Sequence, residues 1–161
     1  MIAPGLLRAE ITPPEKHLGF QPGQDFKLAN WSQITAYFRL LDEVSDRVKV
    51  VELGQTTLGR PLILAIITAE ENMPELEKYR KIQERLHDPR GLSPGERAHL
   101  IKEGKAVVYI SCSIHSTEIA ASQMSMELAY RLASDNSPEI KNILNQVILL
   151  LVPSANPDGI D

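Results

Sequence analysis

Two runs constrain what this chain can fold into, one apolar until its last residue and one fully apolar. Residues 106–111 have the sequence AVVYIS, and residues 147–152 have the sequence VILLLV. Each run has the length of a strand, and near-continuous apolar strands are typical of parallel sheets that are covered on both faces. We therefore expect residues 106–111 to form a central strand that is buried on both faces.

The segment between these two runs is amphipathic. Residues 118–134 carry apolar side chains three or four positions apart, which predicts a helix. The buried face of this helix is predicted to carry Ala121, Met124, Leu128 and Leu132. Strand, helix and strand together make a βαβ unit, whose crossover is right-handed in nearly all cases.

The rest of the chain extends this pattern. Residues 48–53 and 61–68 are predicted strands joined by a loop that glycines bracket, which indicates a β-hairpin. Further helices are expected over residues 31–46, 73–87, 94–104 and 138–145, the first three capped by Asn30, Asn72 and Ser93. The predicted fold class is α/β: a three-layer α/β/α arrangement with a mixed, centrally parallel sheet flanked by helices on both faces.

Proline content divides the chain into two parts. Residues 1–29 carry four prolines, each of which fixes φ and removes a backbone donor, so we expect a proline-rich N-terminal arm that is extended on the surface. Residues 30–161 are then the domain proper. A chain of 161 residues, 43% of them hydrophobic, suits one globular domain.

Charge, cysteine content and hydropathy exclude several classes of protein. The net charge of −4 leaves no basic excess to attract phosphates, so nucleic acid is not an expected partner. The single cysteine excludes an internal disulfide and a cysteine-rich zinc finger. The longest apolar run, residues 147–153, is far shorter than the ~18 residues of a membrane span, and residues 1–8 lack the basic and apolar regions of a signal peptide.

Two loops follow the apolar strands, at the sheet edge where α/β proteins bind their ligands. The first contains His115 and Glu118, which are three positions apart. This spacing allows an imidazole nitrogen and a carboxylate oxygen to converge on one ion about 2 Å from each, and this pair of ligands suits zinc better than magnesium or calcium. His115 and Glu118 are therefore candidate metal ligands.

The residues of these two loops also have simpler interpretations that do not involve a metal. An acid such as Glu118 is favoured in a first helical turn by the helix dipole alone, and His115 could be a loop histidine bonded to a carbonyl. In the second loop, Asn156–Pro157–Asp158–Gly159 consists of turn-forming residues, and a turn role is favoured for Asp158 over metal binding. The other histidines are expected to be surface residues: His17, His87 and His99.

Three segments in order resemble the zinc carboxypeptidase family, the carboxypeptidase A-like metallopeptidases. They are residues 54–62 (GQTTLGRPL), residues 114–118 (IHSTE) and residues 156–159 (NPDG). The resemblance extends over residues 31–161. It implies that His115 and Glu118 are two of three protein ligands to a catalytic Zn²⁺, with a water in the remaining position, and that the substrate is the C-terminus of a peptide or protein.

The resemblance also indicates what this chain lacks. The third ligand, a histidine, the general-base glutamate and the substrate-binding residues of the family would lie beyond Asp161, so we expect an incomplete and inactive part of a catalytic domain, with no catalytic residue besides the ligands. Where the family often has a substrate-binding arginine, this chain has Thr117, which leaves the substrate preference open. The compartment is also open, and a secreted or periplasmic location would fit the resemblance.

Three alternatives remain at this point. A thiol hydrolase would use Cys112 with His115, although a cysteine that ends an apolar strand favours a buried, inert thiol. A zinc-dependent deacylase of acyl amino acids would use a similar metal site. A non-catalytic carboxypeptidase-like module would bind peptides or proteins. For the isolated chain we also expect self-association, through an unpaired edge at its last strand.

Overall fold

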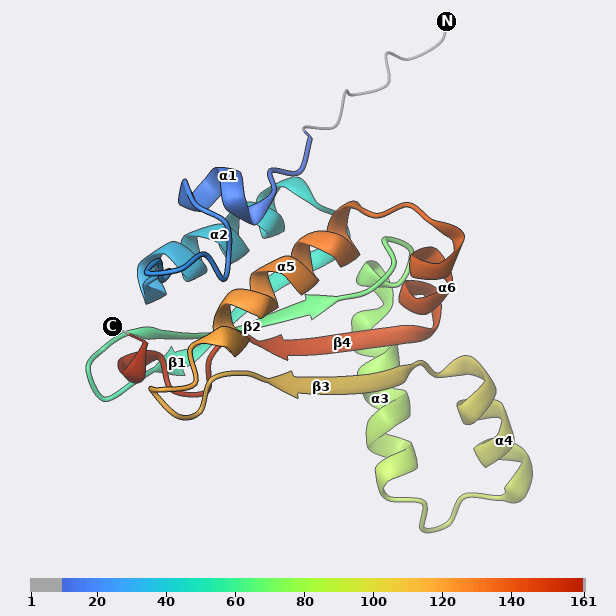
Figure 1. Cartoon of the computed structure of the whole chain (residues 1–161). Coiled ribbons are helices and arrows are strands. Elements are labelled where there is room, and N and C mark those ends of the chain that lie inside the picture. Colours follow the sequence, from blue (N-terminus) through green and yellow to red (C-terminus); the bar gives the residue numbers. More distant parts are fainter. Residues whose placement is uncertain (1–9, 161) are drawn as a thin grey trace, which may run out of the picture.

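A four-stranded mixed sheet organises the chain in the computed structural model, which describes residues 10–160 (Figure 1). The elements in chain order are α1 (Pro14–Leu18), α2 (Trp31–Val44), β1 (Val48–Gln55), β2 (Pro61–Ile67), η1 (Met73–Glu75), α3 (Leu76–His87), α4 (Pro94–Glu103), β3 (Ala106–Ser111), α5 (Ala120–Ser134), α6 (Pro138–Gln146), β4 (Val147–Val152) and η2 (Pro157–Gly159). None of the helices in this part of the chain is long and apolar enough to span a membrane.

The strand order in the sheet is β1-β2-β4-β3. The hairpin strands β1 and β2 are antiparallel, β2 and β4 are antiparallel, and β3 and β4 are parallel, with Ala106 opposite Val147. The expected hairpin and the expected parallel βαβ unit are therefore both confirmed.

The position of β3 differs from the expectation. Within residues 10–160, β3 pairs only with β4, so it is an edge strand, and Val107 and Tyr109 are exposed. The inner strands are β2 and β4, and β4, which lies between β2 and β3, is mostly buried. Within residues 10–160 the expectation of a central β3 is not met, because apolar composition marks a strand that can be covered, but not which neighbour covers it. For the same reason the expected edge at the last strand was wrong.

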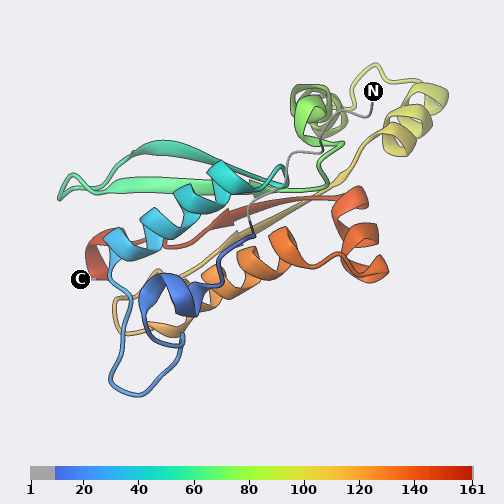
Figure 2. The same cartoon turned by 90° about the horizontal axis from the view of Figure 1, so that it is seen from above.

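Helices cover both faces of this sheet, as expected for the α/β class. On one face, Ile63, Ala65 and Leu151 belong to the main core together with side chains of α2 and α5. On the other face, Ile148 packs against Tyr79 and Ile82 of α3 in a smaller cluster. Figure 2 shows α2 and α5 on one side of the strands and α3 on the other. Ile148 and Leu151 of β4 face opposite sides of the sheet because successive side chains of a strand point to opposite faces.

The helix ends follow from their capping residues, with one exception. Asn30 and Ser93 cap their helices as expected, and the structure shows a full capping box at each. Asn72 does not cap a helix. Its side-chain amide instead donates to the carbonyl oxygens of Leu144 and Asn145 and to Thr68 Oγ1, so it ties the end of β2 to the end of α6.

The buried face of α5 is rotated from the predicted one. Met124 is 46% exposed, whereas Ser125, Met126 and Ala129 are fully buried. Small side chains at Ser125 and Ala129 allow the helix to lie close to α2 and β2. The predicted stripe is right at Leu132, which is buried in the main core, and wrong at Met124, because apolar positions alone do not reveal buried serines.

The segment before α2 is not an extended surface arm over its described part. Residues 14–18 form α1, whose Leu18 joins the main core. His17, expected to be exposed, is half-buried: its Nε2 lies 3.1 Å from the Gln33 carbonyl oxygen, and its ring contacts the Tyr37 ring. Proline content indicated the absence of a long helix, but it did not exclude a five-residue helix that starts at Pro14.

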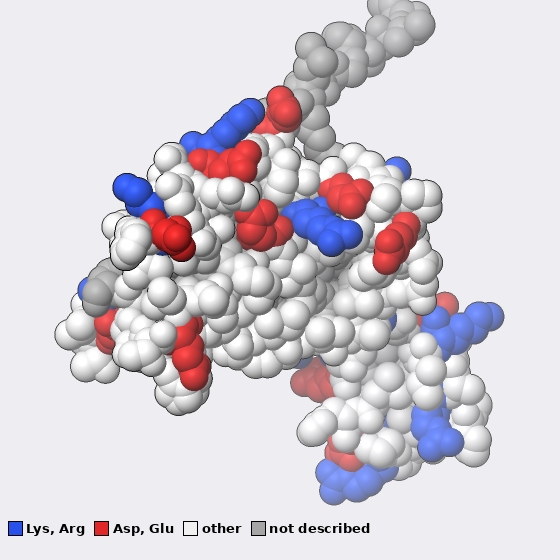
Figure 3. Space-filling view, viewed as in Figure 1, with Lys and Arg blue, Asp and Glu red and all other residues white. Residues whose placement is uncertain are grey.

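Charged side chains of both signs share the visible surface, and Lys and Arg gather over α3 and α4 (Figure 3). Several of them belong to ion pairs along α3: Arg80 contacts Glu77 and Glu84, and Lys78 contacts Glu103 of α4. Ion pairs between exposed side chains are screened by solvent and contribute little to stability. The attachment of α3 to the sheet therefore depends on Tyr79 and Ile82 rather than on its charges.

The exposed edge leads to a prediction for the isolated chain. We expect residues 1–161 alone to self-associate, because β3 offers unpaired backbone groups and the apolar side chains of Val107 and Tyr109. A lysine at Tyr109 should reduce the association, whereas a lysine at exposed Ile101 of α4 should not. Light scattering as a function of concentration measures this, and a monodisperse monomer at high concentration would contradict it.

Candidate metal centre

Two loops meet at the edge of the sheet where β3 and β4 end, at the left of Figure 1. The Ala155 N–H donates to the Cys112 carbonyl oxygen at 2.8 Å, and the Ser154 hydroxyl donates to the Ser113 carbonyl oxygen at 3.1 Å. The loop after β3 and the loop after β4 are therefore hydrogen-bonded to each other. This is the arrangement that a parallel strand pair predicts for its two C-terminal loops.

His115 and Glu118 face one another within the first loop. His115 Nδ1 lies 3.0 Å from Glu118 Oε2, and the Glu118 N–H donates to the His115 carbonyl oxygen at 3.1 Å. Both side chains are about two-thirds exposed, at 68% and 62%. At a separation of 3.0 Å, a nitrogen and an oxygen can both lie about 2 Å from one ion. The residues present therefore fit two positions of a zinc ligand set.

The start of α5 holds this loop in place. The helix begins at Ala120, so Glu118 lies before it and not within its first turn as expected. The Ser122 N–H donates to Ser113 Oγ at 2.9 Å, and Ser113 Oγ donates to the Glu118 carbonyl oxygen. Ser113 thus satisfies a free N–H of the first helical turn, and it has a φ of 45°, an uncommon conformation for a residue other than glycine.

The remaining candidates do not join this pair. His87 and His99 are exposed on α3 and α4, as expected. The turn over Pro157–Gly159 is confirmed, and both carboxylate oxygens of Asp158 accept hydrogen bonds from the loop between β1 and β2. Within residues 10–160 no group of three or more His, Cys, Asp and Glu side chains could hold a metal.

Cys112 has the environment of an inert thiol. It is 4% exposed, belongs to the main core, and burial raises its pKa above the ordinary value. A nucleophilic cysteine needs the opposite, a lowered pKa in an accessible site. These features do not favour a thiol hydrolase.

We therefore expect slow alkylation of Cys112 in the folded protein at neutral pH, because the thiolate is scarce and shielded. Iodoacetamide labelling followed by mass spectrometry measures the rate, with the protein in denaturant as the control. Rapid labelling of the folded protein, with an apparent pKa well below 8.5, would contradict this expectation.

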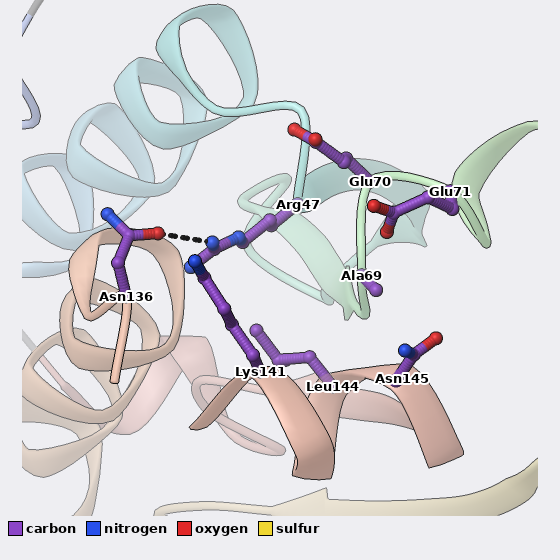
Figure 4. A pocket seen from close by; sticks show the side chains of 8 residues that line it. All are labelled: Arg47, Ala69, Glu70, Glu71, Asn136, Lys141, Leu144 and Asn145. Atoms are coloured by element: carbon purple, nitrogen blue, oxygen red, sulfur yellow. Dashed lines mark hydrogen bonds between the residues drawn. The ribbon is translucent and has the colours of Figure 1, made fainter. Parts of the chain in front are cut away.

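A polar pocket of about 310 Å³ lies at the opposite end of the strands (Figure 4). Arg47 lines it and donates to the carbonyl oxygens of Leu132 and Asp135 and to Asn136 Oδ1. These bonds satisfy acceptors at the end of α5, where a cation is favoured. Arg47 thus has a structural role there, remote from His115.

Comparison with known proteins decides the family. The family model described as "zinc carboxypeptidase" matches residues 34–161. The chain belongs to the zinc carboxypeptidase family. This family consists of metallopeptidases that use Zn²⁺ as cofactor, and the expected cofactor and hydrolase class are thereby confirmed at the level of the family. A comparison with curated proteins finds no match.

Solved structures of similar fold agree with this assignment. The carboxypeptidase A from Helicoverpa armigera is 18% identical with a TM-score of 0.58, and 90% of this chain matches 31% of that chain. The metallo-carboxypeptidase from Burkholderia cenocepacia is 23% identical with a TM-score of 0.54, and 80% of this chain matches 27% of that chain. Bovine thrombin-activatable fibrinolysis inhibitor, in complex with a tick carboxypeptidase inhibitor, is 16% identical with a TM-score of 0.56, and the match covers 84% of this chain and 33% of that one. This zinc carboxypeptidase chain thus spans about a third of the length of these structures, and at such identities the likeness shows the fold alone.

Sequence reasoning missed one connection near the site. Thr56 and Arg60 of the hairpin loop contact Asp158. Residues 54–62 and 156–159 were each recognised as segments, but no local pattern pairs side chains about a hundred positions apart.

Proposed function

We propose that this chain supplies two zinc ligands, His115 and Glu118, to a metallocarboxypeptidase that removes C-terminal residues from peptides by means of a metal-activated water. The observation that carries the proposal is the 3.0 Å separation of His115 Nδ1 and Glu118 Oε2 at the C-terminal edge of a parallel strand pair. In this proposal residues 30–161 are part of the catalytic domain, and the third ligand and the general base come from residues outside those described.

Each ligand has a defined task. The imidazole of His115 provides a neutral nitrogen and the carboxylate of Glu118 provides a negative oxygen, a combination that zinc accepts in catalytic sites. Bound zinc lowers the pKa of a coordinated water towards ~7 and polarises the scissile carbonyl. The hydrogen bond from the Glu118 N–H to the His115 carbonyl oxygen keeps these two residues within one turn.

Substrate recognition is less defined by this chain. Thr117 lies between the two ligands, at the position where the family often has an arginine. A threonine cannot form the bidentate, charged contact of an arginine with a carboxylate. We therefore propose that binding of the substrate carboxylate depends on residues outside 10–160.

The test uses the complete gene product with two substrate sets: N-blocked dipeptides and tripeptides, and acylated single amino acids. Release of the C-terminal residue from the peptides, lost on dialysis against a chelator and restored by Zn²⁺, is the expected result. Release of acyl groups alone would indicate a deacylase. Peptide binding without any release would indicate a non-catalytic module.

A further inference from the structure

The turn over residues 156–159 contacts two separate parts of the chain. On one side it contacts the hairpin loop between β1 and β2, and on the other side it contacts the loop that carries His115 and Glu118. All three segments lie at the left of Figure 1. The turn is therefore placed to connect the hairpin with the candidate metal ligands.

Asp158 makes the connection to the hairpin loop. Thr56 Oγ1 donates to Asp158 Oδ1 at 2.6 Å, and the Leu58 N–H donates to Oδ2 at 3.2 Å. Arg60 Nη1 lies 3.1 Å from the Asp158 carbonyl oxygen and 3.4 Å from Oδ1. These partners, the Thr56 hydroxyl first, hold the pKa of the Asp158 carboxyl below its ordinary value. Asp158 is thus a charged acceptor at neutral pH, and charge-assisted bonds of this kind are stronger than neutral ones.

Asn156 and Gly159 make the connection to the ligand loop. Asn156 Nδ2 donates to the Ile114 carbonyl oxygen at 3.1 Å. Gly159 lies so close to this loop that an added Cβ would be 2.9 Å from Ser116 Cβ and 2.7 Å from Asn156 Nδ2. The backbone on either side of His115 is therefore held by the turn.

This support matters because the ligand side chains have little support of their own. Both are about two-thirds exposed, so the packing of neighbours does not fix their rotamers. Their positions then depend on the backbone from Ser113 to Glu118. A metal site needs its ligands held within about 0.5 Å of the productive geometry.

We propose that Asp158 is a positioning residue for the metal site: by fastening the turn to the hairpin loop, it holds Asn156 and Gly159 where they fix the backbone around His115. This inference rests on the proposed function, because it assigns the turn a role in the geometry of that site. A positioning role for Asp158 differs from a merely structural role in one measurable respect. A structural role predicts a loss of thermal stability alone, whereas a positioning role predicts a change in the metal site itself.

The experiment measures zinc affinity of the complete gene product by competition with a chromophoric chelator, together with the visible spectrum of the cobalt-substituted protein. The variant Asp158→Ala should raise the zinc Kd about tenfold, the lower end of what loss of an outer-shell partner costs, and should alter the cobalt bands. Asp158→Asn keeps an oxygen acceptor for the Thr56 hydroxyl and should restore the Kd to within about threefold of the unsubstituted protein. Should Asp158→Ala fail to fold, Thr56→Val removes one of these bonds with little change of shape, and we expect a rise in Kd of about threefold.

Asp88→Ala is the matched control, because Asp88 also forms an ion pair with an arginine, Arg90, in the loop between α3 and α4. Its zinc Kd should not change. An unchanged zinc Kd and cobalt spectrum in Asp158→Ala, beside a clear loss of affinity in His115→Ala, would overturn the positioning role alone. Equal zinc affinity of the unsubstituted protein and His115→Ala would overturn the proposed function and this inference with it.

Discussion

In the complete protein, His115→Ala should lower peptidase activity by at least about a thousandfold, which corresponds to about 4 kcal/mol of transition-state stabilisation. The substitution removes one of the two proposed ligand atoms, which lie 3.0 Å apart, and an alanine offers no donor to replace Nδ1. Glu118 alone would then have to hold a zinc ion on this loop, and without that ion's charge a water would not be activated. Zinc content by atomic emission and the rate of C-terminal residue release measure the two losses together, and we expect the same result for Glu118→Ala.

His99→Ala provides the control, since His99 is also an exposed histidine but lies on α4. Its zinc content and activity should match those of the unsubstituted protein. Near-normal zinc content and activity in His115→Ala would exclude His115 as a zinc ligand. The proposal that Glu118 is a ligand would then lack the second ligand that supports it. Loss of activity with zinc fully retained would instead show that His115 has a role other than metal binding.

Phe38→Ala should destabilise the folded chain by about 3–5 kcal/mol. Phe38 is fully buried on α2, contacts the ring of Tyr37 edge-on and belongs to the main core. Its truncation removes apolar contacts and leaves a cavity between helices and sheet, where the surroundings can relax only in part. Urea unfolding followed by circular dichroism measures the difference in the free energy of unfolding.

The same substitution at Phe26 is the matched control. Phe26 is fully exposed, at 103%, so Phe26→Ala should change stability by no more than about 0.5 kcal/mol. If both variants lost several kcal/mol, the placement of these two rings relative to the core would be wrong. If neither did, α2 would not be part of the cooperative unit.

Local sequence patterns predicted well where the helices and strands lie. They predicted less well which strand lies at the edge of the sheet and which face of a helix is buried. The helix caps at Asn30 and Ser93 and the apolar β4 are properties of a few neighbouring residues, and the structure agrees with them. The edge position of β3 and the buried face of α5 depend on partners that lie elsewhere in the chain. A run of apolar residues does not encode which neighbour covers it, and a buried serine such as Ser125 resembles an exposed one in the sequence.

In the candidate site, too, features of neighbouring residues could be predicted and contacts between distant residues could not. His115 and Glu118 became candidates from their spacing, their place after an apolar strand and the family resemblance, all of which involve residues close together in the chain. The contribution of Thr56 and Arg60 to the neighbouring turn could not be predicted, since these side chains meet Asp158 across about a hundred residues. Such pairs appear only once the order of the strands is known.

The connection between the hairpin and the turn also bears on how this chain folds as it is synthesised. The hairpin can form from residues that are adjacent in sequence, and hairpins form within about 1–10 μs. His115 and Glu118 leave the ribosome about 40 residues before Asp158, which at ordinary rates of synthesis is roughly two to eight seconds. During that interval the ligand loop has neither Asn156 nor Gly159 to hold it. In the proposed function, the geometry of the two ligands is therefore acquired only after β4 has emerged and docked, so a nascent chain would carry the hairpin well before it could bind zinc.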